Sequence, residues 1–178
     1  MADDGRPSGS ADPVEEPASG DTPSSLTREL RRVEELCRNF YDAFESQNID
    51  RMEALWSHTG HARCIHPGWE PVVGWSEIRQ SWIEIFRSMD TIDFEIVDSH
   101  FEVSDQLAWA NLVIHASMVT EEGETFETMV VATNIFERRG TDWCIVLHHS
   151  SHVLDDDDDD DEDDDDDGID EIDSSQPN

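Results

Sequence analysis

The sequence predicts an α+β domain in which helices come first and an antiparallel sheet follows. Three observations support this prediction. Up to about residue 89, apolar residues recur at steps of three and four, as on the buried side of a helix. From Ile92 onward, apolar and polar residues alternate, as they do in strands. The strand-like segments are joined by connections of only two to four residues, which is the length of hairpin turns.

The first expected helix begins at Ser24 or Ser25, because either hydroxyl can cap a helix N-terminus. It ends at residues 47–48. A second, shorter helix is expected from Asp50, where Asp50 and Glu53 have the spacing of a capping box. The apolar stripe of the first helix consists of Leu26, Leu30, Val33, Cys37, Phe40, Tyr41 and Phe44.

The segment after the second helix contains two prolines and two glycines, which favour short strands and turns. We expect a short strand at residues 61–66, a turn at 67–68 and a second short strand at 72–73. A third helix follows at about residues 76–89, with apolar residues again at helical spacing.

Four long strands are expected at residues 92–103, 106–119, 125–137 and 142–153, in an antiparallel meander. Two of them are apolar on both sides, which indicates a sheet that is covered on both faces. The helices can cover one face. Another copy of the chain is the simplest cover for the other, so a homodimer is expected.

The charge of the chain is divided among three regions. The chain carries 44 acids against 11 basic residues, a net charge of −33, and 16 of the acids lie in residues 155–173. We expect a globular domain at residues 25–154 between two solvated, disordered tails, 1–24 and 155–178. Because the domain holds 22 acids and only ten arginines, neither nucleic acid nor an anionic membrane is expected as a partner.

The basic residues are all arginine, with no lysine anywhere in the chain. An acidic, lysine-free domain suits a cytoplasm of high salt, where charge repulsion is screened. The alternative is a biased genome composition without adaptive content. The chain shows no signal peptide, no apolar run of about 18 residues and three cysteines without CxxC spacing, which together predict a cytoplasmic protein.

Three motifs resemble a known family: CIHPGWEPVVGWSEIRQSW, VVATNIFER and GTDWCIVLHHSSHV. Over roughly residues 26–154 the chain resembles the SnoaL-like branch of the nuclear transport factor 2-like (NTF2-like) superfamily. The resemblance implies a cone-shaped, cystatin-like fold, with three N-terminal helices packed in a curved antiparallel sheet around a cavity, and a dimer formed through the outer face of the sheet. Known members include steroid isomerases, polyketide cyclases, dehydratases, kinase association domains and transport adaptors, so the fold does not select one function.

His66 is the first candidate for chemistry. It ends the first short strand, close in sequence to Trp69 and Trp75. A histidine that titrates near neutrality beside aromatic side chains suits an acid–base role. The alternative is a histidine that caps a turn and packs on a tryptophan.

The last strand ends in HHSSH, whose residues alternate between the two faces of the sheet. In one register Trp143, Ile145 and Leu147 point inward, and His149 and Ser151 follow them. In the other register the inward residues are His148, Ser150 and His152. We expect His149 to share the acid–base role of His66 and His148 to contact a ligand, or else these residues to form a polar dimer edge.

Polar residues inside apolar strands also indicate a site. Asn134, Asn111 and His115 are candidates for a polar cavity floor, because a buried amide must find hydrogen-bond partners. Four aromatic residues are candidate ligand contacts, although their spacing also fits an ordinary core: Tyr41, Trp56, Trp69 and Trp82. His148 and His152 are about 13 Å apart along an extended strand at ~3.3 Å per residue, too far to share one metal ion. A site that combines one of them with His66 or Cys64 is the alternative, but no metal and no cofactor are expected.

Two functions are compatible with these residues. The first is a domain that binds a small, largely apolar molecule and is isomerase-, cyclase- or dehydratase-like, with a histidine moving a proton next to a carbonyl and Asn134 orienting the substrate. The ketosteroid isomerases pair a carboxylate base with a tyrosine, and no carboxylate can be placed opposite Tyr41, the only tyrosine. The second is a non-catalytic, dimeric association module.

Overall fold

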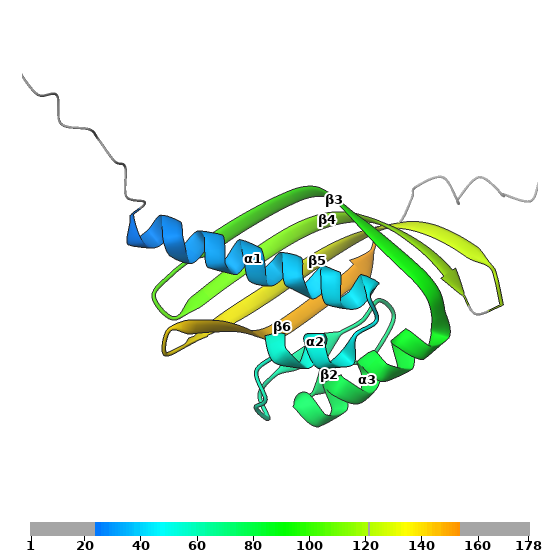
Figure 1. Cartoon of the computed structure of the whole chain (residues 1–178), viewed down its shortest axis with the longest axis horizontal. Coiled ribbons are helices and arrows are strands. Elements are labelled where there is room, and N and C mark those ends of the chain that lie inside the picture. The colour runs from blue at the N-terminus through cyan, green and yellow to red at the C-terminus, as the bar shows by residue number, and fades with distance from the viewer. Residues whose placement is uncertain (1–23, 121, 154–178) are drawn as a thin grey trace, which may run out of the picture.

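The computed structural model describes residues 24–120 and 122–153, and both expected tails lie outside this part except for Ser24. Three helices and six strands form an α+β fold, as predicted (Figure 1). In chain order the elements are α1 (Ser25–Glu45), α2 (Ile49–Leu55), β1 (Arg63–Ile65), β2 (Val72–Val73), α3 (Trp75–Ser88), β3 (Met89–Val103), β4 (Leu107–Thr120), β5 (Thr125–Arg139) and β6 (Asp142–His152).

The helix starts follow from local hydrogen bonds. Ser24 caps α1, and its hydroxyl oxygen accepts from the backbone N–H of Thr27 at 3.1 Å. The predicted capping box at Asp50 is wrong, because α2 begins one residue earlier, after Asn48. The side-chain oxygen of Asn48 accepts from the backbone N–H groups of Asp50 and Arg51 and so satisfies the first turn of the helix.

The six strands form one sheet in the order β2-β1-β6-β5-β4-β3. The four long strands form the predicted antiparallel meander. The expectation of a purely antiparallel sheet is wrong in one place, since β1 pairs with β6 in parallel. The chain reaches β1 from α2 rather than through a hairpin. It already runs alongside β6 at Ser57, whose N–H donates to the carbonyl of Ile145 at 2.9 Å.

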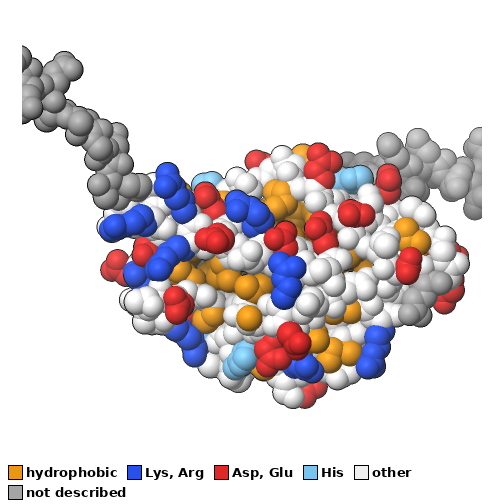
Figure 2. Space-filling model, viewed as in Figure 1, with side chains coloured by type: hydrophobic (Ala, Val, Ile, Leu, Met, Phe, Trp, Pro, Cys, Tyr) orange, Lys and Arg blue, Asp and Glu red, His pale blue; other side chains and the backbone are white. Residues whose placement is uncertain are grey.

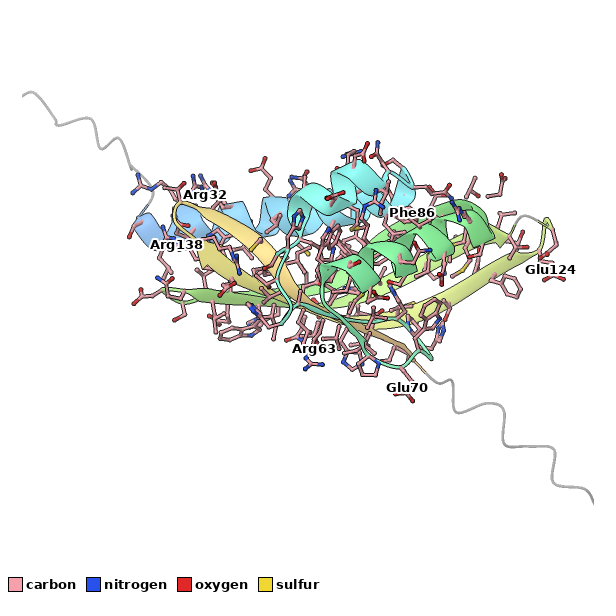
Figure 3. The ribbon with its side chains drawn as sticks, turned by 90° about the horizontal axis from the view of Figure 1, so that it is seen from below. Arg32, Arg63, Glu70, Phe86, Glu124 and Arg138 are labelled. Carbon is pink, nitrogen blue, oxygen red and sulfur yellow. The ribbon has the colours of Figure 1, made fainter. Side chains whose placement is uncertain are left out.

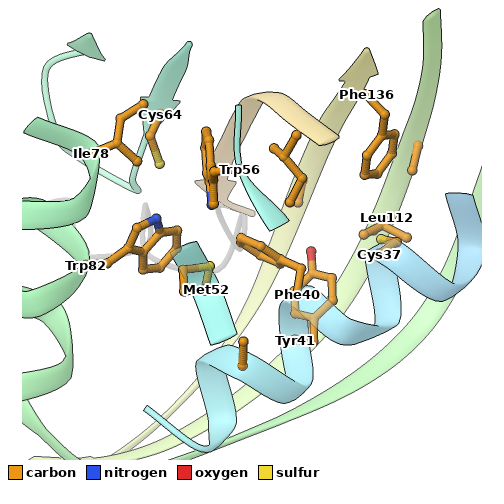
Figure 4. Packing of buried hydrophobic residues seen from close by; sticks show 14 of the residues in the cluster. Cys37, Phe40, Tyr41, Met52, Trp56, Cys64, Ile78, Trp82, Leu112 and Phe136 are labelled. Carbon is orange, nitrogen blue, oxygen red and sulfur yellow. The ribbon is translucent and has the colours of Figure 1, made fainter. Parts of the chain in front are cut away.

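All three helices lie on one side of the curved sheet (Figure 3). In the described part of the chain no helix covers the other side, to which Arg63 of β1 points. The core lies between the helices and the inner face of the sheet, and aromatic rings fill much of it (Figure 4). Phe40 of α1 makes edge-to-face contacts with Tyr41 and with Trp82 of α3, at ring-centroid distances of 5.1 and 5.5 Å.

The exposed surface of the helices carries mixed charge. Acidic side chains are spread over this face, and arginines gather around the start of α1 (Figure 2). Some of them pair: Arg138 lies 3.4 Å from Glu29, which also accepts from the indole N–H of Trp143 at 2.8 Å. That hydrogen bond, together with nearby arginines, lowers the pKa of Glu29.

Candidate functional site

A pocket of about 270 Å³ lies between α3, the end of α1 and the inner face of β3–β6. Its walls are mostly apolar, and none of the described residues that line it is Asp, Glu, Lys or Arg. The main apolar side chains are Phe44, Ile85, Ile92, Phe94, Ile114 and Met118. The polar side chains come from the ends of β1, β6 and α3 and from α1: His66, His148, Ser150, His152, Ser88 and Tyr41.

A β-bulge in β6 determines which histidines face this pocket. The register of β5 with β6 shifts between Ile135 and Phe136, so that Val146 has no partner. Trp143 and Ile145 are therefore buried on the inner face, and after the extra residue His148 and Ser150 are buried on the same face. Neither of the two expected registers holds along the whole strand, because each assumed uninterrupted alternation.

His148 is held by Asn134 of the neighbouring strand. The two residues are direct cross-strand partners, and Nδ1 of His148 lies 2.7 Å from Oδ1 of Asn134. The Asn134 amide nitrogen donates to Sγ of Cys37 at 3.6 Å, and in this orientation the amide oxygen accepts from His148. His148 therefore carries its hydrogen on Nδ1, and Nε2 has a free lone pair.

His66 is held in the same way by Ser81 of α3. The Ser81 hydroxyl donates to the carbonyl of Ile78 at 2.8 Å, so its oxygen accepts from Nε2–H of His66 at 2.9 Å. The hydrogen of His66 is thus on Nε2, and Nδ1 has the lone pair. The ring packs edge-to-face on Trp69 and Trp82, at centroid distances of 5.1 and 4.6 Å.

Burial keeps both histidines neutral. It lowers the pKa of His66 to about 4. It lowers the pKa of His148 to about 3, with smaller contributions from His66 and His149. The expectation that His66 titrates near neutrality is therefore wrong, because the imidazolium would lose its hydration in the core. At neutral pH the two rings offer lone pairs and no positive charge.

Two buried donors have no hydrogen-bond partner among the described residues of this pocket. They are the hydroxyl of Tyr41 and the indole N–H of Trp82. Burial, the largest cause, raises the pKa of Tyr41, so its hydroxyl stays protonated. Unpaired buried donors are costly, and neighbouring side chains cover both atoms, so neither is exposed to the open space of the pocket.

Of the two remaining aromatic residues expected to contact a ligand, Trp69 lines the pocket and Trp56 does not. Trp69 lines the pocket and is 43% exposed, so it stands at the rim. Trp56 does not line the pocket. It is 3% exposed and packs beside Trp75, with ring centroids 6.1 Å apart, as part of the core.

Three predicted site residues lie on the opposite face of the sheet. Asn111 is exposed and donates to the Thr133 hydroxyl at 2.8 Å. His115 lies 3.9 Å from a carboxylate oxygen of Glu127. His149 is exposed on this face, one residue beyond His148. Of the expected polar floor only Asn134 points inward, and it contacts His148 rather than lining the pocket.

The sequence did contain a signal for Ser81 that was missed. Ser81 falls on the apolar stripe of α3, between Ile78 and Trp82, and a polar residue in such a stripe needs a buried partner. Inward Ser150 was one of the two expected alternatives, and the bulge at Val146 lets Ser150 share the inner face with Trp143 and Ile145.

The described residues include neither a cluster that could hold a metal ion nor a helix that could cross a membrane. Their His, Cys, Asp and Glu side chains nowhere gather in a group of three or more that could hold a metal ion. None of the described helices is long and apolar enough to cross a membrane.

Comparisons with known proteins agree on the family and the fold. A sequence profile of the SnoaL-like domain family matches residues 33–155. The F-box protein SKIP8 of Arabidopsis thaliana is 27% identical over 115 residues, which are 65% of this chain and 47% of that protein. The chain therefore spans about half the length of this curated relative.

Solved structures from bacteria have the same fold. A candidate dehydratase of the NTF2-like family from Streptomyces avermitilis is 26% identical, with a TM-score of 0.66, over 72% of this chain and 99% of that one. A candidate association domain of a calcium/calmodulin-dependent protein kinase type II from Thiobacillus denitrificans is 27% identical, with a TM-score of 0.59, over 68% and 94%. An NTF2-like superfamily protein from Salmonella enterica is 17% identical, with a TM-score of 0.66, over 70% and 91%, and supports the fold alone.

Proposed function

The chain belongs to the SnoaL-like domain family, and from this premise we propose that its pocket binds a small, neutral, largely apolar molecule. The observation that carries this proposal is the lining of the pocket, in which two neutral histidines stand in an uncharged, aromatic wall. Such a combination of apolar surface and a few convergent polar groups is typical of ligand sites. A charged ligand would lose its hydration there without gaining a counter-ion.

We further propose that, in an enzymatic reaction, His66 accepts a proton from a carbon next to a carbonyl. Its Nδ1 lone pair belongs to a base with a pKa of about 4, similar to the general base of the ketosteroid isomerases. The similarity to a candidate dehydratase at 26% identity supports an enzymatic role.

A pair of neighbouring substitutions tests whether the pocket binds ligands. Ala116 lines the pocket, whereas Ser117 points to the outer face. We expect Ala116→Phe to fill the pocket and abolish the binding of naphthalene, measured by quenching of tryptophan fluorescence. Ser117→Phe, which adds a ring on the other side of the same strand, should leave binding unchanged. Equal binding by both variants would refute the site.

The alternative function is a non-catalytic association module, and one observation favours it. The outer face of the sheet exposes large apolar side chains, among them Leu107, Trp109 and Val131 at 50%, 41% and 41%. Exposed apolar patches of this kind mark interaction surfaces. The partner that we propose is a second copy of the chain, and the similarity to a candidate kinase association domain supports it.

The oligomeric state separates the two functions. If the outer face forms a homodimer, Trp109→Glu combined with Val131→Glu should halve the mass in sedimentation equilibrium. Naphthalene binding by the resulting monomer would support the pocket proposal. A loss of partners without any ligand binding would support the association module.

We also propose that the chain works in a salty cytoplasm, because its 44 acids far outnumber its 11 lysine or arginine residues, all of which are arginine. Screening by salt shortens the range of repulsion among these acids. The melting temperature should therefore rise from low to multimolar KCl. An unchanged melting temperature would remove this proposal.

A further inference from the structure

We infer that the pocket selects a flat apolar ligand that carries a hydroxyl group, with the hydroxyl donating to His66 or His148. This inference rests on the proposed function of the pocket as a binding site. It adds the chemical class of the ligand, and it depends on the direction of the hydrogen bonds behind each histidine.

The hydrogen bonds behind the two pocket-lining histidines leave each ring with one nitrogen free to accept. With the Ser81 hydroxyl donating to the carbonyl of Ile78 at 2.8 Å, its oxygen accepts from Nε2 of His66 at 2.9 Å. Asn134 presents its oxygen to His148, because its amide group donates to Cys37. In each ring the nitrogen that carries hydrogen is thus turned to the protein, and the other nitrogen keeps a lone pair.

The two lone pairs lack a good donor among the described residues. Among the described residues the hydrogen-bond partner of His66 Nδ1 is Sγ of Cys64 at 3.9 Å, a weak donor that lies closer to Nε2, at 3.6 Å. No hydrogen bond involves Nε2 of His148. Buried acceptors without donors cost free energy, so a ligand hydroxyl that supplies the hydrogen is favoured over an ether or a hydrocarbon.

The two rings also stand close to each other. Both pack against the same indole, Trp82, with centroid distances of 4.6 Å for His66 and 6.0 Å for His148. They lie on neighbouring strands, since Cys64, two residues before His66, is the register partner of His148. One hydroxyl group can therefore meet the acceptor side of this pair.

The remainder of the ligand must be uncharged and fit aromatic walls. An ammonium group could also donate to the histidines, but no carboxylate among the described residues lines the pocket to balance its charge. An anion would face two lone pairs. Phe44 and Phe94 form part of the wall, with ring centroids 4.8 Å apart, and a cavity of about 270 Å³ suits a molecule of two fused rings.

Three probes of nearly equal shape test the inference on the full chain at pH 7: 2-naphthol, 2-methoxynaphthalene and naphthalene. The ether keeps the oxygen but has no hydrogen to donate. We expect 2-naphthol to bind about tenfold more tightly than the ether, as for one hydrogen bond to a buried acceptor. Binding is measured by quenching of tryptophan fluorescence and by calorimetry.

A matched pair of variants assigns the preference to the histidine. His66→Phe keeps a ring against Trp82 and leaves the Ser81 hydroxyl bonded to Ile78. We expect the preference for 2-naphthol to fall to twofold or less in His66→Phe, or in His148→Phe if the hydroxyl donates to that ring. His149→Phe changes a histidine on the outer face and should keep the full preference. Near-ultraviolet circular dichroism checks that both variants are folded.

The outcomes separate the two levels of the proposal. If none of the three probes binds, the pocket is not a ligand site and the proposed function fails. If all three bind equally, or if 2-acetylnaphthalene binds more tightly than 2-naphthol, the site stands and the hydroxyl inference is overturned. A preference that persists in folded His66→Phe and also in folded His148→Phe overturns it as well.

Discussion

The two faces of the central strands carry the same kinds of residue in opposite environments. On the inner face Asn134 and His148 are buried and bonded to each other at 2.7 Å. On the outer face Asn111 and His149 are exposed. The inner histidine is neutral because burial lowers its pKa to about 3. The difference teaches that residue type alone does not define a site here, since the face of the sheet decides the chemistry of each side chain.

Removing the bulge at Val146 should disturb the difference between the inner and outer faces of the sheet more than any other change. Deleting Val146 restores strict alternation in β6, so either Ile145 or His148 must turn to the wrong face. We expect a loss of more than about 4 kcal/mol in the free energy of unfolding, as for a rearranged core. Val146→Ala, which keeps the extra residue, should lose only about 1 kcal/mol. Urea unfolding measures both, and equal stability of the deletion and the parent would contradict the role of the bulge.

The pH dependence of stability is the next largest effect. The folded pKa values of about 4 for His66 and about 3 for His148 lie below the ordinary 6.5. Between pH 6.5 and 4 the unfolded chain binds protons that the folded chain does not, so stability that is present above pH 6.5 is lost as the pH falls. Each histidine contributes a slope of about 1.4 kcal/mol per pH unit in this window, or roughly 3 to 4 kcal/mol for both between pH 7 and pH 5.

Two variants separate the contribution of the buried histidines to this pH dependence from that of the other titrating groups. His66→Phe should lose about half of the slope in urea unfolding at pH 7, 6 and 5. His149→Gln, on the outer face, should keep all of it. An unchanged slope in His66→Phe would mean that His66 is not buried in solution as it is in the structure.

Substitution of the two asparagines gives a smaller contrast. Asn134→Ala leaves Nδ1–H of His148 without an acceptor and should cost about 2 kcal/mol. Asn111→Ala removes one exposed hydrogen bond and should change stability by less than about 0.5 kcal/mol. Chemical unfolding of both variants gives the comparison. Similar losses would show that the two faces are equally solvated.

The cysteines should show the smallest difference, in reaction rate rather than stability. Burial raises the pKa of Cys37 to about 12 and raises that of Cys64 as well. The half-buried Cys144 has a raised pKa, mainly from burial, but keeps some access to solvent. Iodoacetamide at pH 8 should therefore modify Cys144 first, as followed by mass spectrometry. Faster labelling of Cys64 would indicate that the pocket side opens easily.

Most of the fold followed from local patterns in the sequence. The helical stripe of α1, the start of the alternating pattern at Ile92 and the short turns predicted each long element to within a few residues. The parallel pairing of β1 with β6 did not follow, because a three-residue strand has no periodicity from which its partner could be predicted.

The candidate site was less predictable than the fold, because several of its residues depend on which face of the sheet the helices cover. Alternation shows that Asn111 and Asn134 each share a face with certain neighbours, but it does not show which face meets the helices. The bulge then reverses the assignment within β6. Likewise, the pKa of His66 was expected to lie near neutrality. The sequence does not show that the ring is buried, because it packs against Trp82 and Ser81 of α3, about fifteen residues further along the chain.

The parallel pairing of β1 with β6 has a consequence for how the domain folds. Hairpins of the meander close short loops, whereas β1 and β6 come from opposite ends of the domain sequence. Closing a long loop is entropically costly, and contacts between distant segments slow folding. His66 and His148 are therefore expected to meet late, after the meander has formed. The pocket would then be one of the last parts of the chain to be built, and a ligand that binds both histidines would slow unfolding more than it speeds folding.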